Sequence, residues 1–142
     1  MAEVTLLLGS NLGDRERNIR SALNLLEIAL GSPWKAISPI VETKACGFDG
    51  PDFLNLAVRF ETRVQPFPLL KTCKMVERNL GRTDEVQYAP DGSRVYHDRV
   101  IDIDILYYGK RRIEGPELTI PHPQVESREF VKELLAKLEE VC

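Results

Sequence analysis

The stretch that decides the fold is Arg99-Val100-Ile101-Asp102-Ile103-Asp104-Ile105-Leu106-Tyr107-Tyr108, a strong β-strand pattern with two carboxylates in its middle. Side chains alternate between the two faces of a strand, so the pattern places Asp102 and Asp104 on one face, opposite the isoleucines and Tyr107. A rise of about 3.3 Å per residue separates the two aspartate Cα atoms by roughly 6.5 to 7 Å. Asp is a poor strand former, and two carboxylates at this spacing repel each other.

Two interpretations of this aspartate pair are open from the residues alone. Hard cations such as Mg²⁺ take oxygen ligands, and proteins usually hold them with one or two carboxylates plus substrate phosphates. Asp102 and Asp104 therefore fit a site for one or two divalent cations. Alternatively, the strand lies at the edge of a sheet with its polar face solvated, where two charges cost little.

The composition is typical of a single globular domain, with 142 residues of which 43 % are hydrophobic and 29 % charged. We therefore expect residues 1–142 to form one domain and to act as a monomer. Cys46, Cys73 and Cys142 are widely spaced, which is typical of reduced thiols in a cytoplasmic protein and not of a zinc site or a disulfide framework. The net charge of −3 and the lack of a targeting segment predict no nucleic-acid partner and no membrane attachment.

Strand and helix patterns alternate on the N-terminal side of the aspartate stretch. Strands are predicted at residues 4–8, 34–42 and 53–62, and helices at residues 14–30 and 66–80. Asp14 is the expected N-cap of the first helix, and Gly31 and Gly81 follow the two helices. Pro39 predicts that the second strand is interrupted or lies at an edge. The alternation within 53–62 predicts a half-buried strand.

The remaining segments are less regular. Residues 82–97 show no periodicity and are predicted to form a long loop, and the length and glycine content of the stretch 82–98 make it a candidate lid over a bound ligand. After the aspartate stretch, a turn at Tyr108-Gly109-Lys110 leads to a short added strand near residues 111–113. Prolines extend residues 118–123, and Ser127 is expected to cap a last helix.

The predicted order strand, helix, strand, strand, helix, strand is the split β-α-β arrangement. We therefore predict an α+β fold, a ferredoxin-like βαββαβ sandwich in which helices pack on an antiparallel sheet. An extra hairpin strand and a C-terminal helix are added to it. Helices cover the apolar face of such a sheet, so its other face can carry a site.

Cationic side chains flank the aspartate pair, namely Arg82, Arg99, His122 and Arg128. Guanidinium groups suit phosphates because their donors form a rigid fork. The sequence contains no P-loop or Rossmann glycine motif, so side chains and a metal would have to hold a nucleotide's phosphates. Each arginine taken alone is better explained as a surface residue, and His122 could equally be a loop residue without a task.

A second candidate surface is formed by Phe53 and Asn55 together with residues 43–46. An aromatic ring and a carboxamide two residues apart in a strand point the same way. One can then stack on a flat heterocycle while the other hydrogen-bonds its edge. Phe53 alone could equally be a core residue. Asn55 is harder to explain in that way, because Asn is depleted in strands and a buried amide needs partners.

Four motifs in order along nearly the whole chain carry a resemblance to a known family. They are Leu8-Gly9-Ser10-Asn11-Leu12, Pro51-Asp52-Phe53-Leu54-Asn55, Arg99-x-x-Asp102-Ile103-Asp104-Ile105-Leu106, and Leu118-Thr119-Ile120-Pro121-His122-Pro123 with the following Arg128 and Phe130. Together they resemble the 6-hydroxymethyl-7,8-dihydropterin pyrophosphokinase (HPPK) family of folate biosynthesis. The resemblance implies a ferredoxin-like enzyme that transfers pyrophosphate from ATP to the hydroxymethyl group of 6-hydroxymethyl-7,8-dihydropterin, giving AMP and the pterin diphosphate.

The resemblance also implies a role for each candidate residue. Asp102 and Asp104 would hold two Mg²⁺ ions that bridge ATP phosphates to the pterin hydroxymethyl oxygen. Thr43 and Asn55 would hydrogen-bond the pterin edge, and Phe53 and Phe130 would sandwich its ring. The residues implied around ATP are Glu77, Arg82, Arg99, Thr119, His122 and Arg128, of which Arg82 and Arg99 would offset charge on the transferred group.

Two other functions fit the residues without the resemblance. One is a ferredoxin-like regulatory module that binds a ligand or partner and performs no chemistry, which predicts no Mg²⁺-dependent release of AMP. The other is a different metal-dependent nucleotidyl or phosphoryl transferase on the same fold, which analysis of the products would separate from a pyrophosphokinase.

Overall fold

The structure, a computed structural model, describes residues 1–44, 51–81, 87–88, 94–95 and 100–140. Its main sheet has the strand order β2-β4-β1-β7, and β3 also pairs with β4. The bounds are β1 Ala2–Ser10, β2 Ala36–Ile37, β3 Val41–Thr43, β4 Phe53–Thr62 and β7 Asp102–Tyr108. Every pairing in this sheet is antiparallel, and the order confirms the predicted ferredoxin-like α+β fold.

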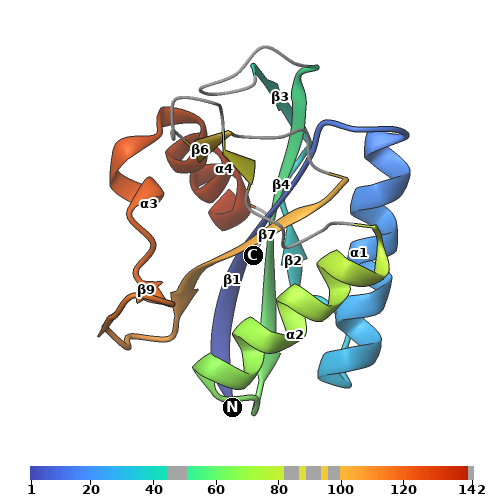
Figure 1. The fold of residues 1–142 in the computed structure, drawn as a ribbon. Coiled ribbons are helices and arrows are strands. Elements are labelled where there is room, and N and C mark those ends of the chain that lie inside the picture. The colour runs from blue at the N-terminus through green and yellow to red at the C-terminus, as the bar shows by residue number, and fades with distance from the viewer. Residues whose placement is uncertain (45–50, 82–86, 89–93, 96–99, 141–142) are drawn as a thin grey trace.

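Helices α1 (Arg15–Leu30) and α2 (Pro66–Asn79) pack against one face of this sheet (Figure 1). The Asp14 side chain accepts a hydrogen bond from the Arg17 N–H, and Gly31 ends α1 in the left-handed conformation, so both predicted signals of this helix are confirmed. Gly81 likewise follows α2 with a φ of +103°. Among the described helices, none has the length and apolar character needed to cross a bilayer.

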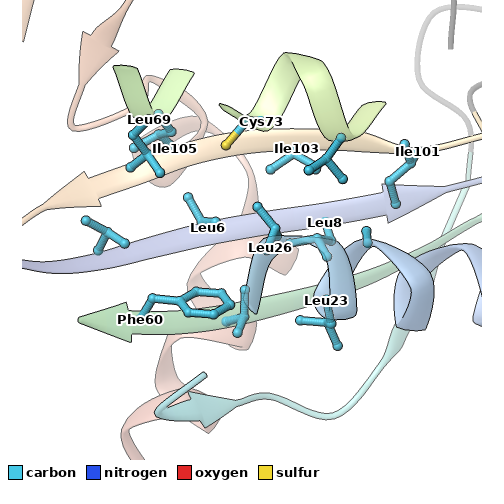
Figure 2. Packing of buried hydrophobic residues seen from close by; sticks show 14 of the residues in the cluster. Leu6, Leu8, Leu23, Leu26, Phe60, Leu69, Cys73, Ile101, Ile103 and Ile105 are labelled. Atoms are coloured by element: carbon cyan, nitrogen blue, oxygen red, sulfur yellow. The ribbon is translucent and has the colours of Figure 1, made fainter. Parts of the chain in front are cut away.

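The larger hydrophobic core lies between these two helices and the sheet (Figure 2). Helix α1 contributes Leu23 and Leu26, and α2 contributes Leu69 and Cys73. The strands contribute alternate residues: Leu6 and Leu8, Val58 and Phe60, and Ile101, Ile103 and Ile105. This alternation is the pattern from which the strands were predicted.

The opposite face of the sheet is not simply open, which corrects the prediction of a half-buried strand at 53–62. Helix α4 (Glu129–Glu140) covers part of it and forms a second hydrophobic cluster with Leu7, Ala57 and Leu106. Ala57 is completely buried and Asn55 is 5 % exposed. Central strand β4 is therefore buried on both faces, and the room for a site is the part of this face that α4 leaves uncovered.

A β-bulge in β7 corrects the predicted face of Tyr107. Leu6 of β1 pairs with Ile105, but the next residue, Thr5, pairs with Tyr107, so Leu106 is an extra residue in β7. The alternation therefore shifts at this point. Tyr107 packs against the second cluster, and Tyr108 takes its place in the larger core with the isoleucines.

Two short hairpins differ from the expected loops. Within the predicted loop 82–97, β5 (Gln87–Tyr88) pairs with β6 (Arg94–Val95), while residues 82–86, 89–93 and 96–99 lie outside the described residues, as does most of the predicted lid. The added strand, β8 (Ile113–Glu114), pairs with β9 (Thr119–Ile120) and not with β7, so the turn at Gly109 does not form the expected hairpin.

The prediction that Ser127 caps the last helix is wrong. Ser127 is the last residue of a separate short helix, α3 (Gln124–Ser127), and Arg128 between the two helices is extended. The Arg128 carbonyl accepts hydrogen bonds from the N–H groups of Val131 and Lys132, so Arg128 takes the N-cap position just before α4 begins at Glu129. The extended residue turns the chain between the two helices.

Cys73 gives a prediction about alkaline stability. Its thiol is 1 % exposed, and burial, with smaller contributions from the negative charges of Glu77 and Asp104, raises its pKa well above the usual range. The unfolded chain releases this proton above about pH 8.5, whereas the folded protein keeps it. Stability is therefore lost as pH rises, by about 1.4 kcal/mol per pH unit from this group.

In Cys73→Val we expect this contribution to disappear. Urea denaturation at a series of alkaline pH values should give a free energy of unfolding that falls less steeply than in the wild type, by about 1.4 kcal/mol per unit. Parallel curves for the two proteins would contradict the prediction, because every other titrating group is common to both.

Candidate active site

The candidate site lies where the ends of three strands meet. Gly9, near the end of β1, pairs with Asn55 of β4 on one side and with Asp102 of β7 on the other. Residues paired directly across antiparallel strands point their side chains to the same face. The sheet therefore places the predicted pterin-binding amide and the first predicted metal ligand on one face, with only a glycine between them.

Asp104 lies two residues further along the same face and is joined to the C-terminal segment. Its Oδ2 accepts a hydrogen bond of 2.8 Å from Nε2 of Gln124, at the start of α3. Oε1 of Gln124 accepts a longer one, 3.4 Å, from Nη1 of Arg128. The Arg128 guanidinium in turn lies 4.3 Å from the ring centroid of Phe130, a cation–π contact. The structure thus brings Asp104, Arg128 and Phe130 together through a residue that the sequence did not single out.

His122 belongs to the same group. Its Nδ1 accepts from the Gln124 backbone N–H at 3.2 Å, so in the neutral ring the proton is on Nε2, which lies 3.9 Å from Asp104 Oδ1. Partial burial lowers the pKa of His122, partly opposed by the negative charge of Asp102. The imidazole is therefore neutral at pH 7 and presents an N–H donor toward the aspartate face.

Glu77 and Thr119 take different positions. The Glu77 side chain, on α2, is 3 % exposed and accepts a 2.8 Å hydrogen bond from the Ile103 N–H of edge strand β7. It thus contacts the backbone between the two aspartates. Thr119 lies in β9, where its hydroxyl donates to the Gly115 carbonyl at 3.3 Å. Arg82 and Arg99, both predicted near ATP, lie outside the described residues.

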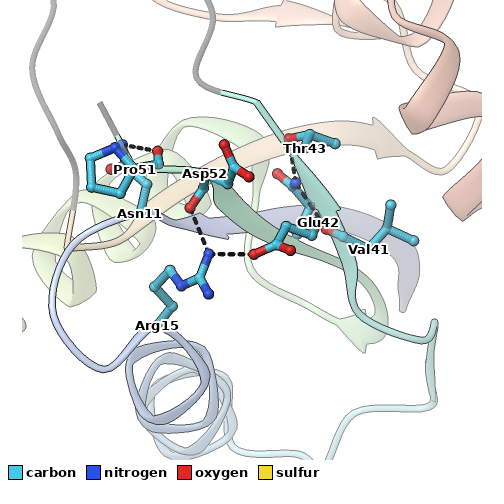
Figure 3. A network of polar contacts seen from close by, with 8 residues as sticks. Asn11, Arg15, Val41, Glu42, Thr43, Pro51 and Asp52 are labelled. Carbon is cyan, nitrogen blue, oxygen red and sulfur yellow. Dashed lines mark hydrogen bonds and ion pairs between the residues drawn. The ribbon is translucent and has the colours of Figure 1, made fainter. Parts of the chain in front are cut away.

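A polar network fixes the predicted pterin side (Figure 3). Nδ2 of Asn55 donates to the Val41 carbonyl at 3.1 Å and to the Thr43 hydroxyl at 2.8 Å, which orients the amide that the sequence singled out. Arg15 of α1 donates to Glu42 in β3 at 2.7 Å and to the Asp52 carbonyl, just before β4, at 2.8 Å. Both strand ends that carry predicted pterin-binding residues are therefore tied to the first helix.

Gly9 is a site residue that the sequence analysis missed as such. A Cβ added there would lie 3.3 Å from Oδ1 of Asn55 and 3.5 Å from Cδ1 of Phe53. The side chains of Asn55 and Phe53, two of the four predicted pterin-binding residues, thus converge over the bare backbone of Gly9. A glycine inside a strand often marks the close approach of a ligand or another backbone, and that signal was available in the sequence.

The donor chemistry fits Mg²⁺. The aspartates offer hard carboxylate oxygens on one face, and the Asp104 side chain is 29 % exposed, so a cation can reach it. In the part of the chain that the structure describes, no group of three or more His, Cys, Asp or Glu side chains gathers into a metal cage. Mg²⁺ commonly uses one or two carboxylates together with substrate phosphates and water, so an open two-carboxylate site suits it.

A separate cavity of about 580 Å³ lies on the same sheet face but at the opposite end of β1. Its lining includes Glu3, Thr5 and Tyr107, and the guanidinium of Arg59, which is ion-paired with Glu139. None of the predicted site residues is among its described lining, so this cavity is distinct from the candidate site.

Comparison with known proteins identifies close relatives. The sequence profile of the 7,8-dihydro-6-hydroxymethylpterin-pyrophosphokinase (HPPK) family matches residues 5–140. The chain is similar to 2-amino-4-hydroxy-6-hydroxymethyldihydropteridine pyrophosphokinase of Bacillus subtilis, with 40 % identity over 136 residues, 95 % of this chain and 75 % of the relative. The Porphyromonas gingivalis protein of that name is 41 % identical over 134 residues, 93 % of this chain and 87 % of the relative. The Pisum sativum "Folate synthesis bifunctional protein, mitochondrial" is 40 % identical over 129 residues, 91 % of this chain but 24 % of the relative.

The buried Glu77 carboxylate gives a prediction about stability. Glu77→Leu would leave the Ile103 N–H without its acceptor, so we expect the free energy of unfolding to fall by about 1 to 3 kcal/mol. Glu77→Gln keeps an acceptor oxygen and should lose less. The exposed Glu126→Leu, at the other end of the site, is the control. Chemical denaturation of the three variants checks this, and equal stability of Glu77→Leu and wild type would contradict it.

Proposed function

This chain belongs to the 7,8-dihydro-6-hydroxymethylpterin-pyrophosphokinase family, and on that premise we propose that it transfers a pyrophosphoryl group from ATP to the hydroxymethyl oxygen of 6-hydroxymethyl-7,8-dihydropterin. The products would be AMP and the pterin diphosphate. The observation that carries this proposal is the pairing of Asn55 and Asp102 across Gly9, because an amide that can hydrogen-bond the edge of a heterocycle then lies beside a carboxylate on one face.

The pterin would lie over Gly9. The Asn55 amide nitrogen is already engaged by β3, whereas its Oδ1 points over Gly9 and can accept from an N–H on the pterin edge. Thr43 would bond the same edge. Phe53 extends over Gly9 from β4, and Phe130 lies in the first turn of α4, which covers another part of this face, so the two rings would enclose the pterin.

ATP would lie on the other side of the pterin hydroxymethyl group, along β7. His122 would donate its Nε2 proton in a hydrogen bond to a phosphate oxygen, and Arg128 would offer its guanidinium fork to the phosphates. Arg82, Arg99 and Thr119 would complete the ATP contacts. Glu77 would act on this site through the β7 backbone, by holding Ile103 between the aspartates.

Asp102 and Asp104 would hold two Mg²⁺ ions. When bound, these ions would supply charge neutralisation for the ATP phosphates and for the attacking oxygen. The protein's own contribution is then mainly positioning, as in phosphoryl transfer generally. His122 is ill-placed to act as a general base, because its Nδ1 accepts from Gln124 and its Nε2 carries the proton. Arg82 and Arg99 would offset the charge of the transferred group.

The aspartates give the first test of this proposal. Asp102→Asn and Asp104→Asn should each lower Mg²⁺-dependent AMP formation from ATP and the pterin by at least about 100-fold, because loss of outer-shell partners alone costs 10- to 100-fold. Asp14→Asn is the matched control, since Asn is an equally good N-cap and the exposed Asp14 is not among the predicted site residues.

Mass spectrometry of the products should show AMP together with a pterin carrying two phosphates. Near-wild-type turnover in both aspartate variants would exclude the metal assignment. Any other nucleotide product would favour a different phosphoryl or nucleotidyl transferase. Complete absence of AMP release would favour a binding module.

Gly9 gives a second test. The Cβ of Gly9→Ala would crowd Asn55 Oδ1 at 3.3 Å and occupy the space above the backbone. Overpacking of about 1 to 3 kcal/mol corresponds to a rise in the pterin KM of roughly 5- to 150-fold, with a smaller effect on the KM for ATP. In the control Gly115→Ala, the added Cβ meets only an ordinary contact of 3.6 Å. Equal changes in the two KM values would contradict a pterin seat over Gly9.

A further inference from the structure

Gln124 occupies a position between an anion and a cation of the candidate site. It is 8 % exposed, donates through Nε2 to Asp104 Oδ2 at 2.8 Å and accepts through Oε1 from Arg128 Nη1 at 3.4 Å. A carboxylate only accepts hydrogen bonds and a guanidinium only donates them. The carboxamide therefore has one orientation that satisfies both neighbours, and each neighbour helps to fix it.

The Gln124 side chain also hydrogen-bonds both charged groups, Asp104 and Arg128, without neutralising either charge. A neutral amide that donates to a carboxylate fixes the direction of its lone pairs while leaving its negative charge available to a cation. Arg128 and Asp104 carry opposite charges and both hydrogen-bond Gln124, so replacing the amide by an apolar side chain would let the guanidinium approach the carboxylate directly. A bidentate ion pair between them would withdraw both from ATP and its metal ions.

The backbone of the same residue orients a third group. The Gln124 N–H donates to Nδ1 of His122 at 3.2 Å, and this hydrogen bond directs the Nε2 proton toward the aspartate face. The backbone N–H of His122 in turn donates a hydrogen bond of 3.0 Å to the carbonyl of Leu106, the extra residue of the β7 bulge. Gln124 is thus anchored to β7, and its side chain is delivered to Asp104 from a fixed backbone.

We propose that Gln124 is a positioning residue of the metal site, which orients the Asp104 carboxylate toward the cation and keeps Arg128 from pairing with it. The proposal rests on the proposed function only in taking Asp104 as a metal ligand. It makes Gln124 an indirect determinant of divalent-cation affinity, with no contact of its own to the reacting atoms.

The test uses Gln124→Met, which keeps the length of the side chain and removes both hydrogen bonds. Mn²⁺ binding is measured from the signal of free Mn²⁺ in electron paramagnetic resonance, with the full chain and a non-hydrolysable ATP analogue present. Loss of an outer-shell partner lowers metal affinity by about 10- to 100-fold, and we expect a weakening in this range. In turnover assays, the Mg²⁺ concentration at half-maximal rate should rise by a similar factor, and excess Mg²⁺ should restore part of the rate.

Gln65→Met is the matched control. Gln65 also accepts a hydrogen bond from an arginine, Arg111, at 3.4 Å, but it lies at the start of α2, where no carboxylate contact to it is recorded among the described residues. The Mn²⁺ affinity of the Gln65→Met variant should equal that of the wild type. Circular dichroism and thermal melting of both variants establish that each is folded, so a change confined to Gln124→Met is not a general loss of structure.

Arg128→Ala tests whether Gln124 keeps the two charges apart. If it does, adding Gln124→Met to Arg128→Ala should weaken Mn²⁺ binding by a smaller factor than the same change does in the wild type. An equal factor in both backgrounds would overturn the spacing role, and unchanged Mn²⁺ affinity in Gln124→Met would overturn the whole proposal.

The outcome is separable from that of the proposed function. A wild-type chain that forms no pterin diphosphate, but whose Mn²⁺ affinity falls in Gln124→Met, would retain the positioning role and lose the reaction. An active wild type whose Gln124→Met variant binds Mn²⁺ as tightly as the wild type would retain the reaction and lose the positioning role.

Discussion

The antiparallel register of β1 is the constraint on which the rest of the structure depends. β1 is flanked by β4 and β7, and its pairing sets Gly9 opposite Asn55 and Asp102 at once. A shift of one residue in either pairing would move a whole set of side chains to the other face. The isoleucines of β7 would then leave the core and the aspartates would enter it. Burial of the core therefore enforces the register, and the register places the polar residues of the site side by side.

The bulge at Leu106 links this sheet to the C-terminal segment. Because Leu106 is an extra residue in β7, its carbonyl is available to the N–H of His122, and this hydrogen bond docks the segment before α3 against the edge strand. Bulges are common next to functional sites, where they redirect the chain. Here the bulge also turns Tyr107 toward the second cluster, so one irregularity serves both the packing of α4 and the placement of His122.

The sequence was sufficient for those features that depend on local pattern. Helical spacing and the glycines at 31 and 81 located α1 and α2, and alternation located β4 with its bounds. The sequence was insufficient where packing between segments far apart in the chain determines the structure. No local pattern shows that α4 covers Ala57, or that Arg128 and not Ser127 stands at the N-cap position of that helix. The bulge did have a signal, since Ile105 and Leu106 are adjacent apolar residues where strict alternation requires one of them to be polar.

The same distinction between local pattern and long-range packing applies to the residues of the candidate site. Asp102, Asp104 and Asn55 stood out because polar residues in apolar strands need partners, and the structure shows hydrogen bonds from Gln124 to Asp104 and from Asn55 to Thr43. Gln124 did not stand out, because a glutamine that follows a proline is an ordinary surface residue by every local criterion. Its burial follows only from the docking of His122 on β7, a contact between residues far apart in the chain.

The two faces of β7 have different roles, one in folding and the other in the proposed binding. On one face, the isoleucines and the Glu77 carboxylate hold the strand rigidly to α2. On the other, two carboxylates are kept at a fixed spacing that would be unfavourable in isolation, since their charges repel. A rigid strand cannot relieve that repulsion by moving the carboxylates apart. In the structure Asp104 accepts a hydrogen bond from the Gln124 amide, and in the proposed reaction cations bound with the ATP phosphates would offset the repulsion between the two carboxylates.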